Sequence, residues 1–263
     1  WTTLTHLDLG SFASFSFKTG KVLLFQPRFK SSNIRSAQKG IFMLKIDKEQ
    51  LKFDGVLWDM DGTIADSEPI HERAIRHTLN KYGVDPTHDD MQNVLGTEGS
   101  KTFEYFQTTY DLTVSFEDYQ ASNYQYFCAH SNEVTPLYGC EVFKSLRALG
   151  VPQAIVTNSD RILVNASLAA LQLEIPGLAV VARNDVRLGK PSPEGYLRAA
   201  YLIDVEPSKL AVIEDSVLGA KAGLLAGMQV IGVPIEENRH KFSSDVTLVK
   251  NAHSLIDALS QSE

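Results

Sequence analysis

The sequence has few cysteines, no long apolar runs and no excess of basic residues. Its 263 residues include only Cys128 and Cys140, too few for a disulfide framework and without the spacing of a zinc site. No apolar run approaches the roughly 18 residues of a membrane span, and VLLF at 22–25 is too short for a signal-peptide core. The formal net charge of -7 argues against a nucleic-acid binder, which would show a basic face. We expect a reduced, cytoplasmic protein that contacts neither membrane nor nucleic acid.

Residues 1–42 differ from the rest of the chain. They are rich in Ser and Phe, and Asp8 is their only acid, so the remaining chain is more acidic than the total charge indicates. Two interpretations are open: an organelle transit peptide, for example to a plastid, or upstream sequence translated together with a protein that naturally starts at Met43. We treat 1–42 as an N-terminal extension outside the folded part.

From Phe53 onward, short apolar runs alternate with segments of helical periodicity. This alternation predicts an α/β fold, a parallel sheet with helices on both faces. The candidate strands are 55–58, 153–156, 178–181, 210–213 and 229–233, and the candidate helices cover about 141–149, 160–172, 193–203 and 216–226.

More than 90 residues separate the first candidate strand from the second, and 69–137 contains no convincing strand. This stretch is rich in Tyr, Phe, His and acids at helical spacing. We predict a small α-helical cap domain over 69–137, inserted into a catalytic core formed by 43–68 and 138–263. Such insertions often cover active sites.

Polar residues follow four of the predicted strands. In open parallel sheets ligands bind at the carboxyl ends of strands, so these residues are expected at one edge: Asp59, Asp61, Gly62, Thr63; Thr157, Asn158, Ser159; Lys190; Glu214, Asp215, Ser216. Two such carboxylates about 4 Å apart repel by roughly 4 kcal/mol at an effective dielectric constant of about 20. A hard cation such as Mg2+ would relieve this repulsion, and a lysine with backbone N–H groups beside it makes a phosphate site.

Four motifs carry a resemblance to a known family. DMDGT, TNS, GKPSPEGY and EDSVLGAKAGLLAGM resemble, in order and spacing, the four motifs of the haloacid dehalogenase superfamily of phosphotransferases. The resemblance covers about residues 53–234 and implies a Rossmann-like fold. DSEPIH is similar to the subgroup whose helical cap follows the first motif.

The resemblance implies a role for each matching residue. Asp59 would be the nucleophile that forms an aspartyl-phosphate, and Asp61 the general acid/base. Thr157 and Lys190 would hold the transferring phosphoryl group, assisted by Asn158 and the backbone around Thr63.

The same resemblance implies a Mg2+ site. Asp215, Asp59 and the main-chain carbonyl of Asp61 would bind the ion, and Glu214 would support the site. The implied function is a Mg2+-dependent phosphomonoesterase acting on a small phosphorylated metabolite, such as a sugar phosphate, as a monomer or weak dimer.

Two alternatives stay open. The first is a phosphosugar mutase of the β-phosphoglucomutase type. Those mutases carry a lysine and an arginine in the stretch resembling VLGTEG, where this chain has Leu95 and Gly99, yet His71 matches a histidine that they use near the hinge. We interpret His71 as a polar hinge contact and Ser67 as the N-cap of the next helix. The second alternative is a non-catalytic, phosphate-binding regulatory protein, against which the proton-transfer acid Asp61 argues.

Overall fold

The computed structural model describes residues 46–94 and 96–260, so the extension 1–42 lies outside the described residues. The described strands are β1 Gly55–Trp58, β2 Ala65–Asp66, β3 Thr135–Pro136, β4 Gln153–Val156, β5 Ala179–Val181, β6 Leu210–Glu214, β7 Gln229–Gly232 and β8 Thr247–Leu248. The described α-helices are α1 Glu68–Lys81, α2 His88–Val94, α3 Gly99–Tyr110, α4 Phe116–His130, α5 Tyr138–Ala148, α6 Arg161–Ala170, α7 Glu194–Leu202, α8 Val217–Leu225 and α9 Ala252–Leu259.

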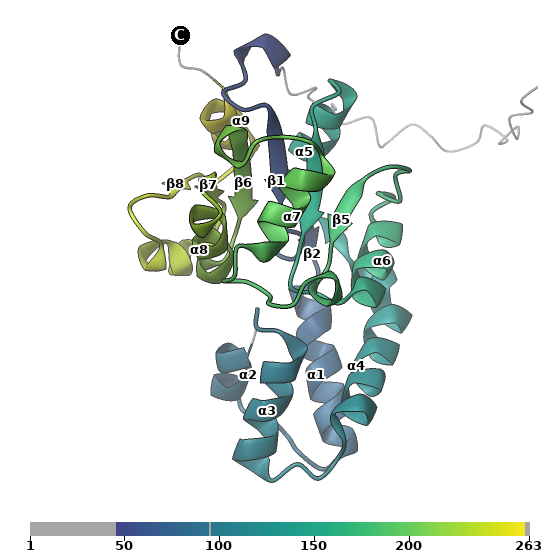
Figure 1. Ribbon diagram of the computed structural model, residues 1–263. Helices are drawn as coiled ribbons and strands as arrows, with labels where there is room; N and C mark the ends of the chain where they lie inside the picture. Colours follow the sequence, from purple (N-terminus) through teal and green to yellow (C-terminus); the bar gives the residue numbers. More distant parts are fainter. Residues whose placement is uncertain (1–45, 95, 261–263) are drawn as a thin grey trace, which may run out of the picture. The chain divides into compact units, whose positions relative to one another are not determined.

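Six strands form one parallel sheet in the order β5-β4-β1-β6-β7-β8 (Figure 1). The first strand lies inside the sheet, with Val56 opposite Gln153 of β4 and Leu57 opposite Val212 of β6. All residues of β1, β4 and β6 are buried, as expected for a sheet covered on both faces. The predicted α/β fold is confirmed. Because these three strands are neighbours and parallel, the polar residues that follow them lie next to one another at one edge of the sheet.

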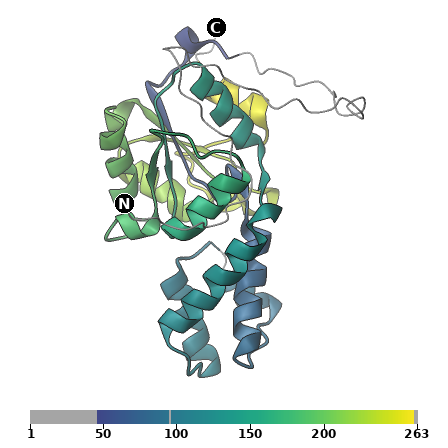
Figure 2. The same ribbon diagram turned by 90° about the vertical axis from the view of Figure 1, so that its right-hand side faces the viewer.

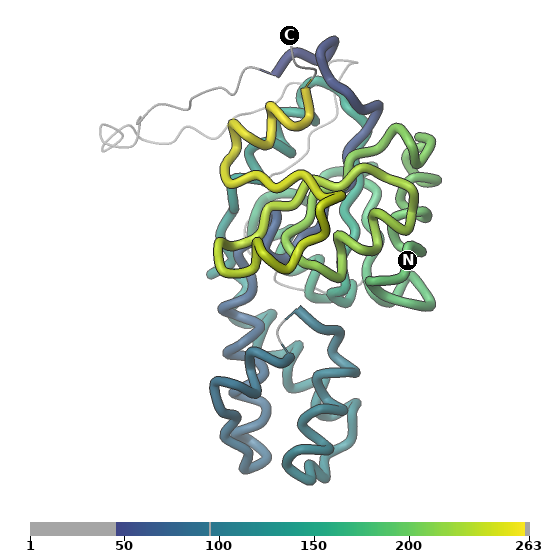
Figure 3. The backbone as a smooth tube through the Cα atoms, turned by 90° about the vertical axis from the view of Figure 1, so that its left-hand side faces the viewer, coloured from purple at the N-terminus to yellow at the C-terminus, as the bar shows by residue number. Residues whose placement is uncertain are grey.

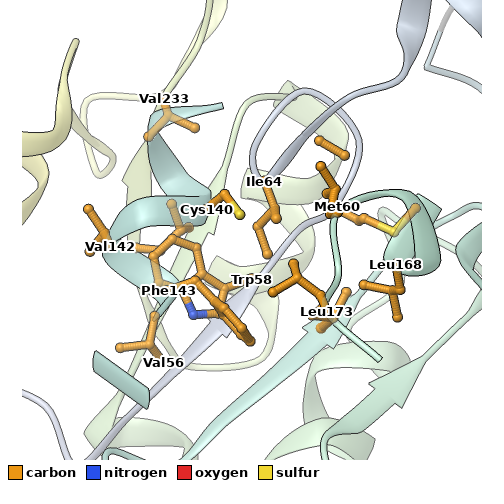
Figure 4. Packing of buried hydrophobic residues seen from close by; sticks show 14 of the residues in the cluster. Val56, Trp58, Met60, Ile64, Cys140, Val142, Phe143, Leu168, Leu173 and Val233 are labelled. Atoms are coloured by element: carbon orange, nitrogen blue, oxygen red, sulfur yellow. The ribbon is translucent and has the colours of Figure 1, made fainter. Parts of the chain in front are cut away.

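The pleat of the strands divides the core into two layers. Val56 and Trp58 of β1 belong to a cluster with α5, α6 and α9, whereas Leu57 faces the cluster with α7 and α8. Figure 2 shows these helices on opposite faces of the sheet. Trp58 packs edge-on against Phe143 at 5.9 Å between ring centroids (Figure 4) and donates to Gln153 Oε1 at 2.8 Å. This packing anchors the end of β1, from which the acidic residues follow.

Helices α1–α4, here called the helical cap, form a group of their own at the bottom of the view (Figure 3). The chain enters the cap through β2 and returns from it through β3, and these two strands pair antiparallel with Ala65 opposite Pro136. The cap has a hydrophobic cluster of its own around Phe106 and Tyr119, while Ile70 and Ala74 at the base of α1 join the cluster of the sheet. The boundaries 69–137 stay a prediction.

Strand β8 and helix α9 were not predicted from the sequence. The strand has only two residues, too few to show a period. Helix α9 has eight residues, with Leu255 and Leu259 buried one turn apart and Asn251 as N-cap, so its pattern is short but present in the sequence. Among the helices of the described ranges, none is long and apolar enough to cross a lipid bilayer.

Candidate active site

The loop after β1 is shaped by backbone hydrogen bonds. The Asp59 N–H donates to Ile213 O at 2.9 Å and so extends the pairing with β6 by one residue. The Met60 carbonyl then accepts the N–H groups of Ile64 and Ala65, each at 2.9 Å, and buried Met60 and Ile64 tie the loop to the core. The turn thus holds the carboxyl groups that follow β1 at the edge of the sheet.

Lys190 is the centre of a buried ion cluster. Its Nζ lies 2.5 Å from Asp59 Oδ1 and 2.5 Å from Glu214 Oε1, and all three residues are less than 9% exposed. Burial lowers the pKa of Lys190, but the charges of Asp59 and Glu214 outweigh burial and raise its pKa well above the usual value. The lysine is therefore a cation that joins β1 to β6.

Glu214 has further hydrogen-bond partners in addition to Lys190. Tyr196 Oη donates to Glu214 Oε1 at 2.9 Å, and the Tyr196 ring lies 5.2 Å from Lys190 Nζ. The second oxygen, Oε2, accepts the Ser216 N–H at 3.0 Å and the Ser216 hydroxyl at 2.9 Å. Both oxygens are hydrogen-bonded, so Glu214 has little freedom to move.

Three carboxylates of the site can offer oxygens to one cation. Oxygen atoms of Asp59, Glu214 and Asp215 lie within 4.8 Å of one another. Burial raises the pKa of Asp215 well above its usual value, and the charges of Asp59 and Glu214 add to the rise. One lysine cannot balance three carboxylates, so a divalent cation with a preference for oxygen, such as Mg2+, fits this donor set.

Asp61 belongs to a different set of contacts. Its Oδ1 accepts from the Ser67 hydroxyl at 2.5 Å and lies 3.5 Å from His71 Nε2, while Oδ2 accepts from Ser159 at 2.7 Å and from Thr157 at 3.0 Å. Burial alone would raise the pKa of Asp61. The nearby His71 imidazole, with the hydroxyls of Ser67 and Ser159, lowers the pKa to about 2. Asp61 is therefore held as an ionised group, ready to accept a proton.

One cavity of about 150 Å³ lies between these residues and the cap. Seven of the predicted site residues line it, namely Asp59, Asp61, His71, Thr157, Asn158, Lys190 and Asp215. Two side-chain contacts join the cap to the core: Arg183 pairs with Glu98, and Tyr124 donates to Asp160. The cavity is therefore covered by the cap in this structure.

The structure places three residues differently from the sequence interpretation. Thr63 does not line the cavity; its hydroxyl is buried without a partner among the described residues, and its N–H donates to Met60 O. The Asn158 amide contacts the backbone of Lys190, accepting its N–H at 2.8 Å, and so fixes the lysine loop. Ser67 is the N-cap residue of α1, as predicted, but its side chain makes no capping bond and its hydroxyl donates to Asp61 instead.

Sequence reasoning placed Ser159 at this edge of the sheet without giving it a role, and the structure shows its hydroxyl donating to Asp61. It missed one residue of the site, Tyr196. Tyr196 ends the motif GKPSPEGY, in the first turn of α7. Only the packing of α7 against the sheet reveals that its hydroxyl reaches Glu214.

Gly62 allows the first loop to approach Asp215. Its φ is +81°, and a Cβ at this position would overlap Asp215 Oδ2. We expect Gly62→Ala to combine backbone strain of about 1 to 2 kcal/mol with displacement of Asp215, and to lower kcat/KM by roughly 10²-fold. Denaturant unfolding and phosphate release measure the two effects.

Gly83→Ala is the matched control for this substitution. Gly83 has φ +79°, yet nothing lies within 4 Å of a Cβ placed there. The Gly83→Ala variant should lose a similar amount of stability through backbone strain alone, and its activity should not change. Equal activity in both variants would contradict a role for the close approach at Gly62.

The fold and the site together define a class of protein: a Rossmann-like α/β enzyme with an acid–lysine centre at the carboxyl ends of its strands and a helical cap inserted after the first strand. The family model described as haloacid dehalogenase-like hydrolase matches residues 56–233. The chain belongs to this family, in agreement with the resemblance of its four motifs.

Individual relatives support the same assignment. The chain is 32% identical over 186 residues to fructose-1-phosphate phosphatase YqaB of Escherichia coli (strain K12), covering 69% of this chain and 97% of that protein. It is 30% identical to hexitol phosphatase A of the same organism, covering 70% and 84%. The crystal structure of CbbY from Rhodobacter sphaeroides in complex with phosphate matches with a TM-score of 0.69 at 24% identity, covering 77% and 96%, which shows a shared fold.

Proposed function

We propose that the chain is a Mg2+-dependent phosphomonoesterase that hydrolyses a small phosphorylated metabolite through an aspartyl-phosphate at Asp59. As a phosphatase of the haloacid dehalogenase-like family, it needs a nucleophile, a proton-transfer group and a phosphoryl-binding cation in one place. The observation that carries the proposal is the arrangement of Asp59, Asp61 and Lys190 around a single cavity.

The first transfer uses Asp59 as the nucleophile. Its carboxylate oxygen attacks phosphorus, the bond from phosphorus to the ester oxygen breaks, and Asp61 delivers a proton to the departing alcohol. Asp61 is ionised in the ligand-free site. An arriving phosphoryl group adds negative charge beside it, which raises its pKa and favours the protonated form. Lys190 balances the charge on the phosphoryl oxygens.

The second transfer returns Asp59 to its starting state. Asp61, now ionised, takes a proton from water as the water oxygen attacks phosphorus, and the bond from phosphorus to the Asp59 oxygen breaks, which releases phosphate and frees the Asp59 carboxylate. The hydroxyls of Ser67 and Ser159 hold the Asp61 carboxylate in one orientation throughout. A fixed carboxylate needs little reorganisation between the two steps.

The metal site would be formed by Asp59 and Asp215, with the main-chain carbonyl of Asp61 and with Glu214 in support. A bound Mg2+ would neutralise the carboxylates and the phosphoryl oxygens at once. The excess of carboxylates over lysine at this edge supports the assignment.

The cavity favours a small ester over a polymer. Its volume of about 150 Å³ is below the roughly 300 to 1,000 Å³ of sites for drug-sized ligands, and the cap covers it. The names of the relatives, a fructose-1-phosphate phosphatase and a hexitol phosphatase, support a sugar phosphate. No lysine or arginine of the described cap residues lines the cavity, which argues against a mutase that must grip a second phosphate.

The test is phosphate release from a panel of small phosphate esters with Mg2+ and after its removal by EDTA. We expect release from at least one sugar or polyol phosphate, lost with EDTA and restored by added Mg2+. Metal-independent release, or none from any ester, would contradict the proposal. Isomerisation of a sugar phosphate, activated by a bisphosphate without net release, would identify the mutase instead.

A further inference from the structure

The loop that carries Lys190 is closed by a carboxylate of the next helix. Glu194 lies in the first turn of α7, and its two oxygens accept the N–H groups of Arg187 at 2.9 Å and of Leu188 at 3.0 Å. Lys190 lies between these donors and Glu194 in the chain. The Glu194 side chain therefore joins the two ends of the segment 187–194, here called the lysine loop.

Helix α7 is fixed against the sheet at the turn that holds Glu194. Tyr196 and Ala199 of the helix are buried in the cluster that contains Leu57 of β1 and Val156 of β4. The helix backbone comes so close to β4 that a Cβ on Gly195 would lie 3.0 Å from Val156 Cγ1. A shift of this turn would disturb close packing. A loop bonded to the turn thus takes its position from the sheet.

The backbone of Lys190 is held at a second point within the lysine loop. Asn158, which follows β4, accepts the Lys190 N–H at 2.8 Å and donates to the Lys190 carbonyl at 3.4 Å. The Ser192 N–H donates to Gly189 O at 3.0 Å and forms a turn around the lysine. The middle of the loop is therefore fixed by Asn158, and its two ends are fixed by Glu194.

The surroundings of Glu194 favour its ionised form. The N–H groups of Arg187 and Leu188 lower the pKa of Glu194, and the charges of Arg187 and Arg198 lower it further. A carboxylate accepts backbone N–H groups more strongly than a neutral carboxyl group does. An acid in the first turn also interacts favourably with the helix dipole, but that effect requires no contact with the loop.

The position of the lysine backbone matters most once Asp59 has reacted. In the ligand-free site Lys190 Nζ lies 2.5 Å from both Asp59 and Glu214. In the proposed aspartyl-phosphate, the Asp59 carboxylate has lost its charge, and Nζ pairs with the phosphoryl oxygens instead. The lysine then depends on Glu214 and on its own backbone to stay in place.

We propose that Glu194 is a positioning residue, which holds the lysine loop so that Lys190 stabilises the phosphoryl group in both transfers. This inference rests on the proposed phosphatase function. Glu194 is not among the residues that line the cavity, so it acts through the loop and makes no contact with the ester.

The test compares Glu194→Ala and Glu194→Gln with the wild-type protein in phosphate release from fructose 1-phosphate and phenyl phosphate with saturating Mg2+. We expect Glu194→Ala to lower kcat roughly 10- to 100-fold, because displacement of a positioned group by about 1 Å has an effect of this size. The loss should lie in kcat more than in KM, since Lys190 acts most strongly on charge in the transition state. It should be equal for the two esters, because they share the phosphoryl group.

Glu194→Gln tests whether the contact with the loop can be restored. Glutamine has the same length and one acceptor oxygen, so its kcat should lie between those of the wild type and Glu194→Ala, roughly 3- to 10-fold below the wild type. Rates are measured well below the melting temperature of each variant. If Glu194→Ala does not fold, a wild-type kcat in Glu194→Gln still overturns the proposal.

Glu141→Ala is the matched control. Glu141 is an exposed acid in the first turn of α5, and its carboxylate has no hydrogen bond or ion pair to any of the described residues. This variant loses the same charge at a helix start but no loop contact, so its kcat should change less than about twofold.

Three results would overturn the role of Glu194. They are a kcat of Glu194→Ala within about twofold of the wild type, an equal loss in Glu141→Ala, and a Glu194→Gln protein no more active than Glu194→Ala. If the wild-type protein releases phosphate from no ester of the panel, the proposed function itself fails and this inference with it.

Discussion

Asp59→Asn is expected to lower kcat for phosphate release by roughly 10³-fold or more, with the fold retained. Asparagine has no carboxylate oxygen with which to form the acyl-phosphate bond to phosphorus. The loss should appear in kcat rather than in KM, because Lys190 and the cavity wall remain to bind the ester. Phosphate release under saturating substrate measures it, and far-UV circular dichroism checks the fold.

Asp54→Asn is the control for this substitution. Asp54 directly precedes β1, is exposed, and pairs with Lys209 at 3.1 Å. Removing its charge should leave turnover unchanged. Full activity in Asp59→Asn would rule out Asp59 as nucleophile, whereas a loss in both variants would indicate a general effect on the strand.

Lys190→Met is expected to lower the free energy of unfolding by about 3 to 5 kcal/mol in metal-free protein, besides lowering activity. The substitution leaves Asp59 and Glu214 buried next to each other without the cation that lies 2.5 Å from each. Urea unfolding measures the change. Added Mg2+ should restore part of the lost free energy of unfolding, because without the lysine the carboxylates bind a cation more strongly.

Lys209→Met is the comparison for Lys190→Met. The pair of Lys209 with Asp54 is more than half exposed, so its loss should cost less than about 1 kcal/mol. Similar losses in the two variants would contradict the view that Lys190 compensates buried charge. A stable, active Lys190→Met protein would remove the lysine from the proposed mechanism.

Much of the fold was predictable because the signals are local. The apolar runs of β1, β4 and β6 are buried on both faces, and strands of this kind read as continuous apolar segments. The helices between them end within a few residues of their predicted limits. In contrast, β8 is two residues long, and its place at the edge of the sheet depends on β7, so no pattern within 247–248 could predict it.

The sequence by itself determined the order of the motifs, the acids that follow β1 and β6, and the lysine before α7, because each of these is a property of a short segment. Only the tertiary structure decided what the side chains contact. The Ser67 hydroxyl donates to Asp61, Asn158 holds the Lys190 backbone, and the Tyr196 hydroxyl donates to Glu214. These orientations depend on elements far apart in the chain that meet through packing, and a side chain's partner is set by which elements pack against it.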